Sequence, residues 1–136
     1  DELEILRQAR LGYDAIAPNP VVTRSEVAQW QALAAKVFVE ESVLDFLLKI
    51  VTATRTETAF RAGVSVRGGL ALKAAAQARA LLQGRDFVIP EDVTSLAPAV
   101  LAHRLVPAHA PGDALEARRV VEAALRQIVS RLPNPA

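Results

Sequence analysis

The sequence predicts an all-α fold, a helical bundle of about five or six helices, and short β-branched stretches leave room for a small two-stranded β patch. Several segments repeat apolar residues at the spacing of one helical face. Hydrophobic residues make up 51% of the 136 residues and aromatic residues only 4%, so aliphatic helices must pack on one another. Most of these segments also begin with residues that favour helix starts. A chain of this length can bury the core of one domain.

The first part of the chain is expected to be separate from the bundle. Residues 1–10 place acidic side chains first and basic side chains last, an order that favours a short helix. Gly12 and the Pro18-Asn19-Pro20 cluster interrupt it. We therefore divide the chain into residues 1–22, a leading segment with a linker loop, and residues 23–136, a helical domain.

Thr23 and Glu26 have the spacing of a capping box, which predicts that a helix starts there. This helix is expected to continue through Val27, Trp30, Leu33 and Ala34. The β-branched stretch at residues 36–39 then predicts a brief extended segment.

The clearest amphipathic helix follows Glu40 and Glu41 and is expected to end near Arg55. Its apolar residues recur at the spacing of one buried face: Val43, Phe46, Leu47, Ile50 and Val51. The two acids lie where the helix dipole favours negative charge, so we assign them a structural role rather than acid–base chemistry.

An alanine-rich helix is expected from Val66 to Leu82, and Gly84 is well suited to end it. The predicted buried stripe consists of Leu70, Ala74, Ala78 and Leu81, whose small members would let neighbouring helices approach closely. Residues 85–89 then form a connection that can contain a short strand.

Pro90 followed by Glu91 and Asp92 predicts the start of another helix, because proline suits the first position and acids suit the first turn. Its buried face is expected to contain Val93, Leu96, Ala97, Val100 and Leu101. Pro107 and Pro111-Gly112 predict a loop.

Asp113 and Glu116 have the spacing of a second capping box, which predicts that a terminal helix starts there. The residues expected to face inward are Val121, Ala124, Leu125, Ile128 and Val129.

The composition excludes several kinds of site. The chain has no cysteine, which rules out disulfides and thiolate metal sites and is compatible with the cytoplasm. His103 and His109 are separated by a proline-containing loop without an acidic cluster, so no metal site is expected. No phosphate-loop motif and no serine nucleophile motif occurs, so the chain alone is expected to catalyse nothing.

The charge distribution gives little support for nucleic-acid binding. The net charge is only +1, and a helix-turn-helix module would need a basic recognition helix. Arg118, Arg119, Arg126 and Arg131 are interpreted as the solvated side of the last helix. No apolar run reaches the roughly 18 residues that cross a bilayer, and nothing resembles a signal peptide. Because the sequence begins at Asp1 without methionine, we expect a piece of a longer protein.

The stretch from Gly63 to Gly69 is the most informative one in the chain. Gly63 can adopt backbone conformations closed to other residues, and the Ser65 hydroxyl can cap the first free amides of the following helix. Arg67 then falls in the first turn, where the helix dipole favours an anion rather than a cation. This position suggests that a negative group lies in front of Arg67.

Four separated motifs occur in an order that resembles the C-terminal lid domain of MoxR-type AAA+ ATPases. They are Val51-Thr52-Ala53-Thr54-Arg55, Gly63-Val64-Ser65-Val66-Arg67, Gly84-Arg85-Asp86-Phe87-Val88-Ile89-Pro90-Glu91-Asp92-Val93 and Val100-Leu101-Ala102-His103-Arg104-Leu105. The segment Asp1-Glu2-Leu3-Glu4-Ile5-Leu6 is similar to the stretch that leaves the ATPase core in this family. The resemblance covers nearly the whole chain.

The resemblance implies a lid packed over a nucleotide that an upstream α/β core binds. In that family the motif arginine, here Arg67, is the sensor 2 residue that contacts the γ-phosphate of ATP. Ser65 and Gly63 would support the cap and the turn. ATP and Mg²⁺ would belong to the full-length parent rather than to this chain alone. Neighbouring subunits of a ring and proteins with von Willebrand factor A domains would be partners, and chaperone-like remodelling the work.

The sequence departs from the family pattern at two positions, with Val66 where proline is usual and Gly68 where alanine is common. Arg55 and Arg104 also match family positions, but their roles stay open. A different class of function stays open too, a stand-alone helical module that binds a partner helix. A phosphate-loop motif about 200 residues upstream would decide in favour of the ATPase lid.

Overall fold

The computed structural model describes Leu3, residues 20–109 and residues 112–135. Contacts divide the chain into two units, residues 1–30 and residues 31–136, with the boundary inside a helix. Of the helix predicted over residues 1–10 only Leu3 is described, and it is helical; the interruption at Gly12 lies outside the described residues.

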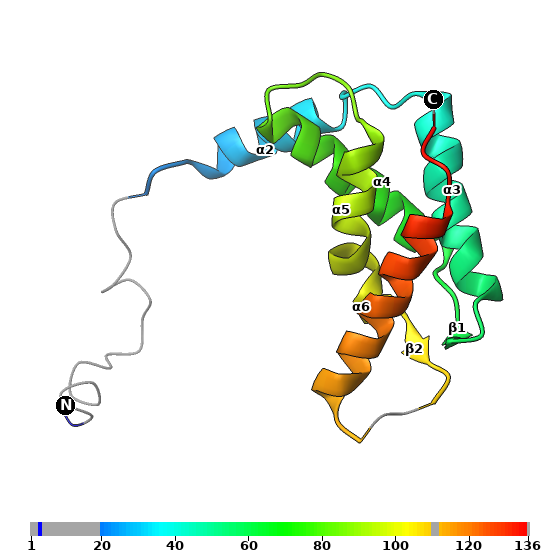
Figure 1. Cartoon of the computed structure of the whole chain (residues 1–136). Helices are drawn as coiled ribbons and strands as arrows, with labels where there is room; N and C mark the ends of the chain where they lie inside the picture. The colour runs from blue at the N-terminus through cyan, green and yellow to red at the C-terminus, as the bar shows by residue number, and fades with distance from the viewer. Residues whose placement is uncertain (1–2, 4–19, 110–111, 136) are drawn as a thin grey trace. The chain divides into compact units, whose positions relative to one another are not determined.

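The described residues form five α-helices, one 3₁₀ helix and two short strands, which confirms the predicted fold class (Figure 1). In chain order these elements are α2 (Arg24–Ala34), α3 (Glu41–Thr56), β1 (Phe60–Ala62), α4 (Val66–Leu82), α5 (Pro90–Leu101), η2 (Ala102–Arg104), β2 (Val106–Pro107) and α6 (Ala114–Arg131). No helix among them is long and apolar enough to cross a membrane.

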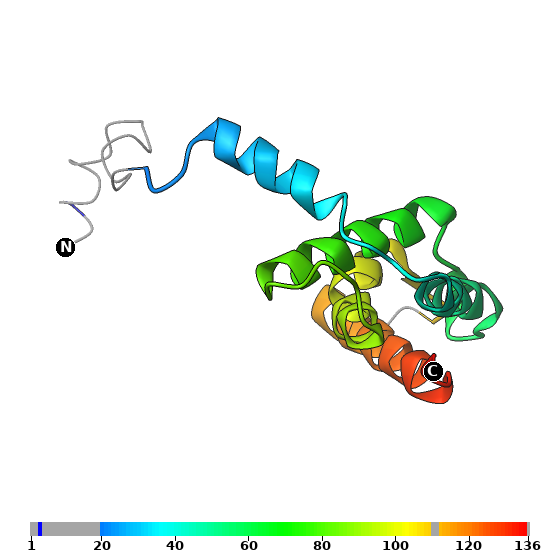
Figure 2. The same cartoon turned by 90° about the horizontal axis from the view of Figure 1, so that it is seen from above.

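Helices α3, α4, α5 and α6 enclose the core. Helix α4 packs against both α3 and α5, and α6 packs against the same two helices. In Figure 2, α3 and α5 are seen nearly end-on, and α4 runs across the bundle. The largest fully buried apolar side chains come from all four helices: Phe46, Ile50, Leu72, Leu101 and Leu125. The core is therefore aliphatic with few rings, as the composition predicts.

Helix α3 matches its prediction closely. It ends at Thr56, and all five apolar residues predicted for its inner face are buried. Thr54 is also buried on this face, with 1% of its surface exposed. The 3.6-residue period is strong in this segment, so the sequence determined both its bounds and its orientation.

The predicted buried stripe of α4 is wrong at Leu70 and Ala74, whereas Ala78 and Leu81 are half-buried and the bounds of the helix are confirmed. Leu70 is 61% exposed and Ala74 is exposed, whereas Gly68, Gly69, Leu72, Ala76, Gln77 and Ala80 are buried. This helix has apolar residues of its own on every side, so the periodicity of the sequence could not identify its buried face. The glycines determine which face is buried, because at Gly69 helix α4 packs closely on the Leu47 and Val51 side chains of α3.

The end of α4 is a Schellman motif. Gly84 has a positive φ of 73° and donates its N–H to the Leu81 carbonyl at 2.9 Å. The Arg85 N–H reaches back to the Ala80 carbonyl at 2.9 Å. The prediction that Gly84 ends the helix is thus confirmed, and the αL conformation requires glycine there.

Two short pairings supplement the helices. Strands β1 and β2 form an antiparallel pair, in which Phe60 lies opposite Pro107 and Ala62 opposite Val106. Pro107 therefore lies in an edge strand, where the missing N–H does no harm, rather than in the predicted loop. The two other stretches expected to be extended meet each other, since Phe38 and Phe87 form a single parallel bridge.

The remaining helix starts are confirmed. In α2 the Glu26 N–H donates to the Thr23 hydroxyl at 3.2 Å, and the Thr23 N–H donates to the Glu26 carboxylate at 2.6 Å. The Glu116 N–H donates to the Asp113 carboxylate at 2.7 Å, which caps α6. Helix α2 has no buried residue, so its capping box is the main local feature that defines its start.

The inner faces of α5 and α6 also follow their predictions. In α5, Val93, Ala97 and Leu101 are buried, and Leu96 and Val100 are half-buried. In α6, Val121, Leu125 and Ile128 are buried, with Ala124 and Val129 half-buried beside them.

Candidate functional site

The start of α4 contains the residues that the sequence selects as a site. Strand β1 ends at Ala62, the chain passes through Gly63, Val64 and Ser65, and Val66 begins the helix. Arg67 is the second helical residue. The order of elements therefore places one cation at the N-terminal end of a 17-residue helix.

Gly63 is needed for close packing rather than for an unusual backbone angle. Among the glycines that the structure describes, only Gly84 has a positive φ, so the predicted conformational role of Gly63 is wrong. A Cβ atom added at Gly63 would lie 2.5 Å from the Arg55 Cα and 2.7 Å from the Arg55 backbone nitrogen. The chain before α4 thus lies directly on the backbone of α3.

Ser65 occupies the N-cap position, but its hydroxyl makes no capping hydrogen bond. The Ser65 carbonyl accepts instead from the N–H groups of Gly68 at 2.9 Å and Gly69 at 3.3 Å. The predicted hydroxyl cap is therefore wrong. The side chain is exposed, and water can satisfy it at no cost to the helix start.

Arg67 is exposed and has no hydrogen-bond or ion-pair partner among residues 20–109 and 112–135. No acidic residue lies in the first turn of α4. The first N–H groups of a helix lack helical acceptors and carry partial positive charge. The guanidinium of Arg67 and this helix end therefore present positive charge together, and they can bind an anionic group.

Two further arginines flank the start of α4, and both match family positions whose roles the sequence left open. The Arg55 Nε donates to the Val64 carbonyl at 2.9 Å. The Arg104 side chain lies beside Gly68, where an added Cβ would be 3.4 Å from the Arg104 Cδ. Arg55 and Arg104, which are distant in the sequence, thus both lie against the short segment that contains Arg67.

A narrow apolar groove adjoins this helix start. It encloses about 140 Å³ between α3 and α4 and is lined by Leu44, Leu47, Leu48, Val51, Val66, Gly69, Leu70 and Lys73. Leu48 is 54% exposed and Val66 is 66% exposed. Leu70, which the sequence predicted to be buried, is therefore one of the residues that line this open groove.

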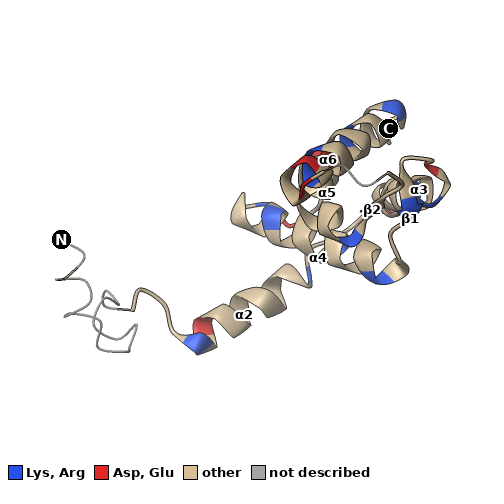
Figure 3. Cartoon of the chain, turned by 90° about the horizontal axis from the view of Figure 1, so that it is seen from below, with Lys and Arg blue, Asp and Glu red and all other residues tan. Residues whose placement is uncertain are grey.

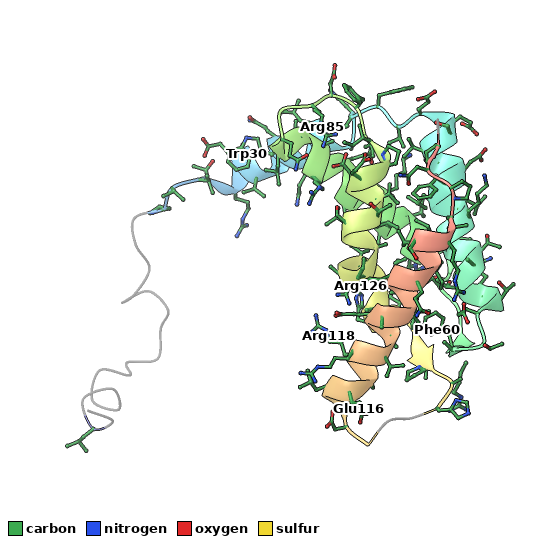
Figure 4. All side chains as sticks on the ribbon, in the orientation of Figure 1. Trp30, Phe60, Arg85, Glu116, Arg118 and Arg126 are labelled. Atoms are coloured by element: carbon green, nitrogen blue, oxygen red, sulfur yellow. The ribbon has the colours of Figure 1, made fainter. Side chains whose placement is uncertain are left out.

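The long motif between α4 and α5 is held by a buried carboxylate. Asp92 is 1% exposed and accepts from the Arg85 Nη1 and Nη2 atoms at 2.8 Å each. It also accepts from the Ile89 N–H at 3.0 Å, and the Arg79 Nε lies 3.2 Å away. Arg85 is labelled in Figure 4, at the connection that joins the two helices.

Burial alone would raise the pKa of Asp92. The hydrogen bonds from Arg85 and Ile89, together with the charges of Arg85 and Arg79, outweigh burial, so the pKa of Asp92 is lowered below its ordinary value. The hydrogen bond to Asp92 in turn raises the pKa of Arg85. The pair therefore stays charged at neutral pH and has a structural role.

The sequence interpretation of Asp92 as a helix-start acid was correct but incomplete, because it missed the two arginine partners. Arg85 and Asp92 lie seven residues apart, on either side of an extended stretch that ends in a proline. A basic and an acidic residue separated by such a stretch are only a weak sequence signal for an ion pair. It becomes informative only once the stretch is known to fold back on itself.

The other polar candidates lie on the surface. Arg118 and Arg126 both pair with Glu122 along α6, at 2.8 Å and 3.2 Å, and Figure 4 shows both arginines on the exposed side of that helix. Figure 3 shows basic residues on several elements rather than on one face. In the described part of the chain no group of three or more His, Cys, Asp or Glu side chains could hold a metal ion. His103 and His109 are both exposed.

Comparison with known proteins gives the family. A model of the AAA lid domain matches residues 52–124, more than half of the chain. The chain is 34% identical over 136 residues to the uncharacterized protein YeaC of Bacillus subtilis, covering 99% of this chain and 41% of that protein. It is 31% identical over 115 residues to the chaperone MoxR1 of Mycobacterium tuberculosis, covering 78% of this chain and 30% of that protein.

A crystal structure of a candidate ATPase from Cytophaga hutchinsonii has the same fold, with a TM-score of 0.73 and 24% identity. The match covers 99% of this chain and 43% of that one, so the chain spans less than half the length of each of these relatives. The resemblance to MoxR-type lids that the four motifs suggest is therefore confirmed. The chain belongs to the AAA lid domain family.

Proposed function

We propose that this chain is the lid of a MoxR-like AAA+ ATPase and that Arg67 is its sensor 2 arginine. In this role Arg67 contacts the γ-phosphate of ATP bound to a separate core. It stabilises the charge that develops during hydrolysis and links the orientation of the lid to the state of the nucleotide.

The observation that carries this proposal is the combination of exposure and position at Arg67. A cation in the first turn of a helix is mildly unfavourable because of the helix dipole, at about 0.3–1 kcal/mol. No described acid compensates for it, and the side chain is exposed to whatever faces this helix end. A phosphate group would turn this unfavourable position into a favourable one.

The residues of this chain fit only one part of an ATP site. Arg67 can bind a phosphate oxygen, whereas the described residues offer no acidic cluster for Mg²⁺. Mg²⁺ and most of the nucleotide contacts would therefore belong to the core. When bound, Mg²⁺ would supply positive charge that offsets the charge of the phosphates, and the lid would contribute the Arg67 guanidinium.

The cellular work of such a protein follows from its relatives by analogy only. Similarity to a protein named as a chaperone supports chaperone-like remodelling or maturation of partner proteins. Proteins with von Willebrand factor A domains and neighbouring subunits of a ring are the partners that the motif resemblance to MoxR-type ATPases implies.

The open apolar groove between α3 and α4 favours a second candidate, a helical interaction module without nucleotide chemistry. The gene that encodes this chain separates the two candidates. A phosphate-loop motif and an acidic Mg²⁺-binding motif upstream support the ATPase lid. A natural start codon near Asp1 without those motifs supports the module.

The direct test is Arg67→Ala in the protein that joins this lid to its core. The variant should retain its fold, because Arg67 is exposed, but should hydrolyse ATP far more slowly. An unchanged rate of hydrolysis would refute the sensor 2 role.

A further inference from the structure

The backbone N–H and C=O of Val64 are held by two consecutive residues of α3. The Thr54 hydroxyl accepts from the Val64 N–H at 2.9 Å, and the Arg55 Nε donates to the Val64 carbonyl at 2.9 Å. Thr54 also donates its hydroxyl hydrogen to the Val51 carbonyl at 2.6 Å, which fixes the orientation of the hydroxyl. Both polar groups of Val64 therefore have partners on the same turn of α3.

This contact is buried and close. Thr54 and Val64 are each 1% exposed, so water cannot replace the hydrogen bond between them. Next to it, Gly63 lies so near the Arg55 backbone that a Cβ has no room. Gly63 and Val64 are thus fixed to the end of α3 by packing as well as by hydrogen bonds.

Val64 is only three residues before Arg67, and the helix begins between them at Val66. A shift of the Val64 backbone would therefore displace the first turn of α4, together with Arg67. On the other side, Gly68 packs against the Val64 side chain. The contacts around Val64 thus determine where the guanidinium of Arg67 can reach.

We infer that Thr54 and Arg55 are positioning residues for Arg67, which act by holding the backbone of Val64 against α3. The inference rests on the proposed sensor 2 role of Arg67. It adds that the last turn of α3 and the first turn of α4 move as one rigid unit. A change in the position of α3 would then be transmitted directly to the arginine.

The first test measures the contact itself by amide hydrogen exchange at Val64. Thr54→Val removes the hydroxyl but keeps the shape of the side chain, and it should accelerate exchange about 10-fold or more. Thr54→Ser should retain the protection. Thr56→Val is the matched control, because among the described residues the Thr56 hydroxyl bonds only to the Ala53 carbonyl in the same helix. Equal exchange rates at Val64 in all four proteins would overturn the inference.

The second test measures ATP hydrolysis in the protein that joins the lid to its core. Thr54→Val should lower kcat about 10-fold to 100-fold with little change in KM, since a displaced catalytic group costs rate rather than binding. Thr54→Ser and Thr56→Val should both hydrolyse ATP at the normal rate. In an Arg67→Ala background, Thr54→Val should cause no further loss, because its effect passes through Arg67.

The outcomes separate the two proposals. If Arg67→Ala slows hydrolysis and Thr54→Val does not, the positioning role is refuted and the sensor 2 role stands. If Thr54→Val slows hydrolysis equally with and without Arg67, its effect is a general loss of structure, and the positioning role is again refuted. If Arg67→Ala leaves hydrolysis unchanged, the proposed function itself fails.

Discussion

At the scale of single residues, Asp92 is the only charged residue that is buried in the described part of the chain. It is buried, and it accepts hydrogen bonds from Arg85 and Ile89 while Arg79 lies close by. Removing its charge would leave Arg85, which is 20% exposed, without its main partner. A buried pair broken on one side is costly, even where the stabilisation by the intact pair is small.

Asp92→Asn should therefore lower the free energy of unfolding by about 2–4 kcal/mol, measured by urea denaturation at neutral pH. Asp86→Asn is the matched control, since the Asp86 side chain is exposed and has no partner among the described residues. It should change stability by less than about 0.5 kcal/mol. Equal stabilities of the two variants would show that the Asp92 ion pair contributes nothing.

The lowered pKa of Asp92 also predicts a pH dependence. A carboxyl whose pKa is lower in the folded state stabilises the fold above its unfolded pKa of about 3.9. That contribution disappears as the pH falls through the folded pKa. Wild-type stability should therefore decrease on acidification below about pH 4, and the difference between wild type and Asp92→Asn should shrink over that range. A difference that stays constant down to pH 2 would contradict the shift.

At the scale of elements, α3 packs on α4 and on the segment before α4 at two glycines. One of them has room for an added methyl group and the other does not. A methyl group at Gly63 would collide with the backbone of α3, which cannot move aside. At Gly69 it would meet the Val51 and Leu47 side chains at 3.4 Å and 3.5 Å, which are ordinary contact distances. The two positions are therefore a matched pair for testing this interface.

Gly63→Ala should destabilise the chain by about 1–3 kcal/mol, the usual cost of overpacking. Gly69→Ala should be neutral or should stabilise by up to about 1 kcal/mol, because alanine is the better helix former. Thermal or urea denaturation of the two variants measures this difference. A Gly63→Ala protein as stable as Gly69→Ala would mean that the chain before α4 does not lie on the α3 backbone.

The same elements show what the sequence can predict. The bounds of α3 and α4 and the caps at Thr23, Gly84 and Asp113 follow from local chemistry, and the sequence contains that chemistry directly. The buried face of α4 does not follow from local chemistry, because the helix has apolar residues on every side. Only contact with α3 distinguishes Gly69, which is buried, from Leu70, which is exposed. The register of Arg67 was predictable from its spacing to Ser65. The Val64 contacts and the Arg85–Asp92 pair needed the folded chain.

At the scale of the whole molecule, the chain is a lid domain, and under the proposed function it contributes one arginine to a site that a separate core completes. Arg67 can meet a phosphate, but the described residues provide neither a Mg²⁺ site nor a phosphate loop. The isolated chain should therefore show no ATP hydrolysis and no tight binding of Mg²⁺–ATP. Isothermal titration calorimetry checks this, and a Kd in the low micromolar range or below would contradict it.

The most direct test of the account is the rate of ATP hydrolysis by the protein that joins this lid to its core, with and without the Arg67 guanidinium. Arg119→Ala is the control, because Arg119 is also exposed and also lacks a partner among the described residues. Arg67→Ala should reduce kcat by about 100-fold or more at unchanged stability, whereas Arg119→Ala should leave kcat unchanged. Equal rates in wild type and both variants would contradict the central claim that Arg67 acts on the nucleotide.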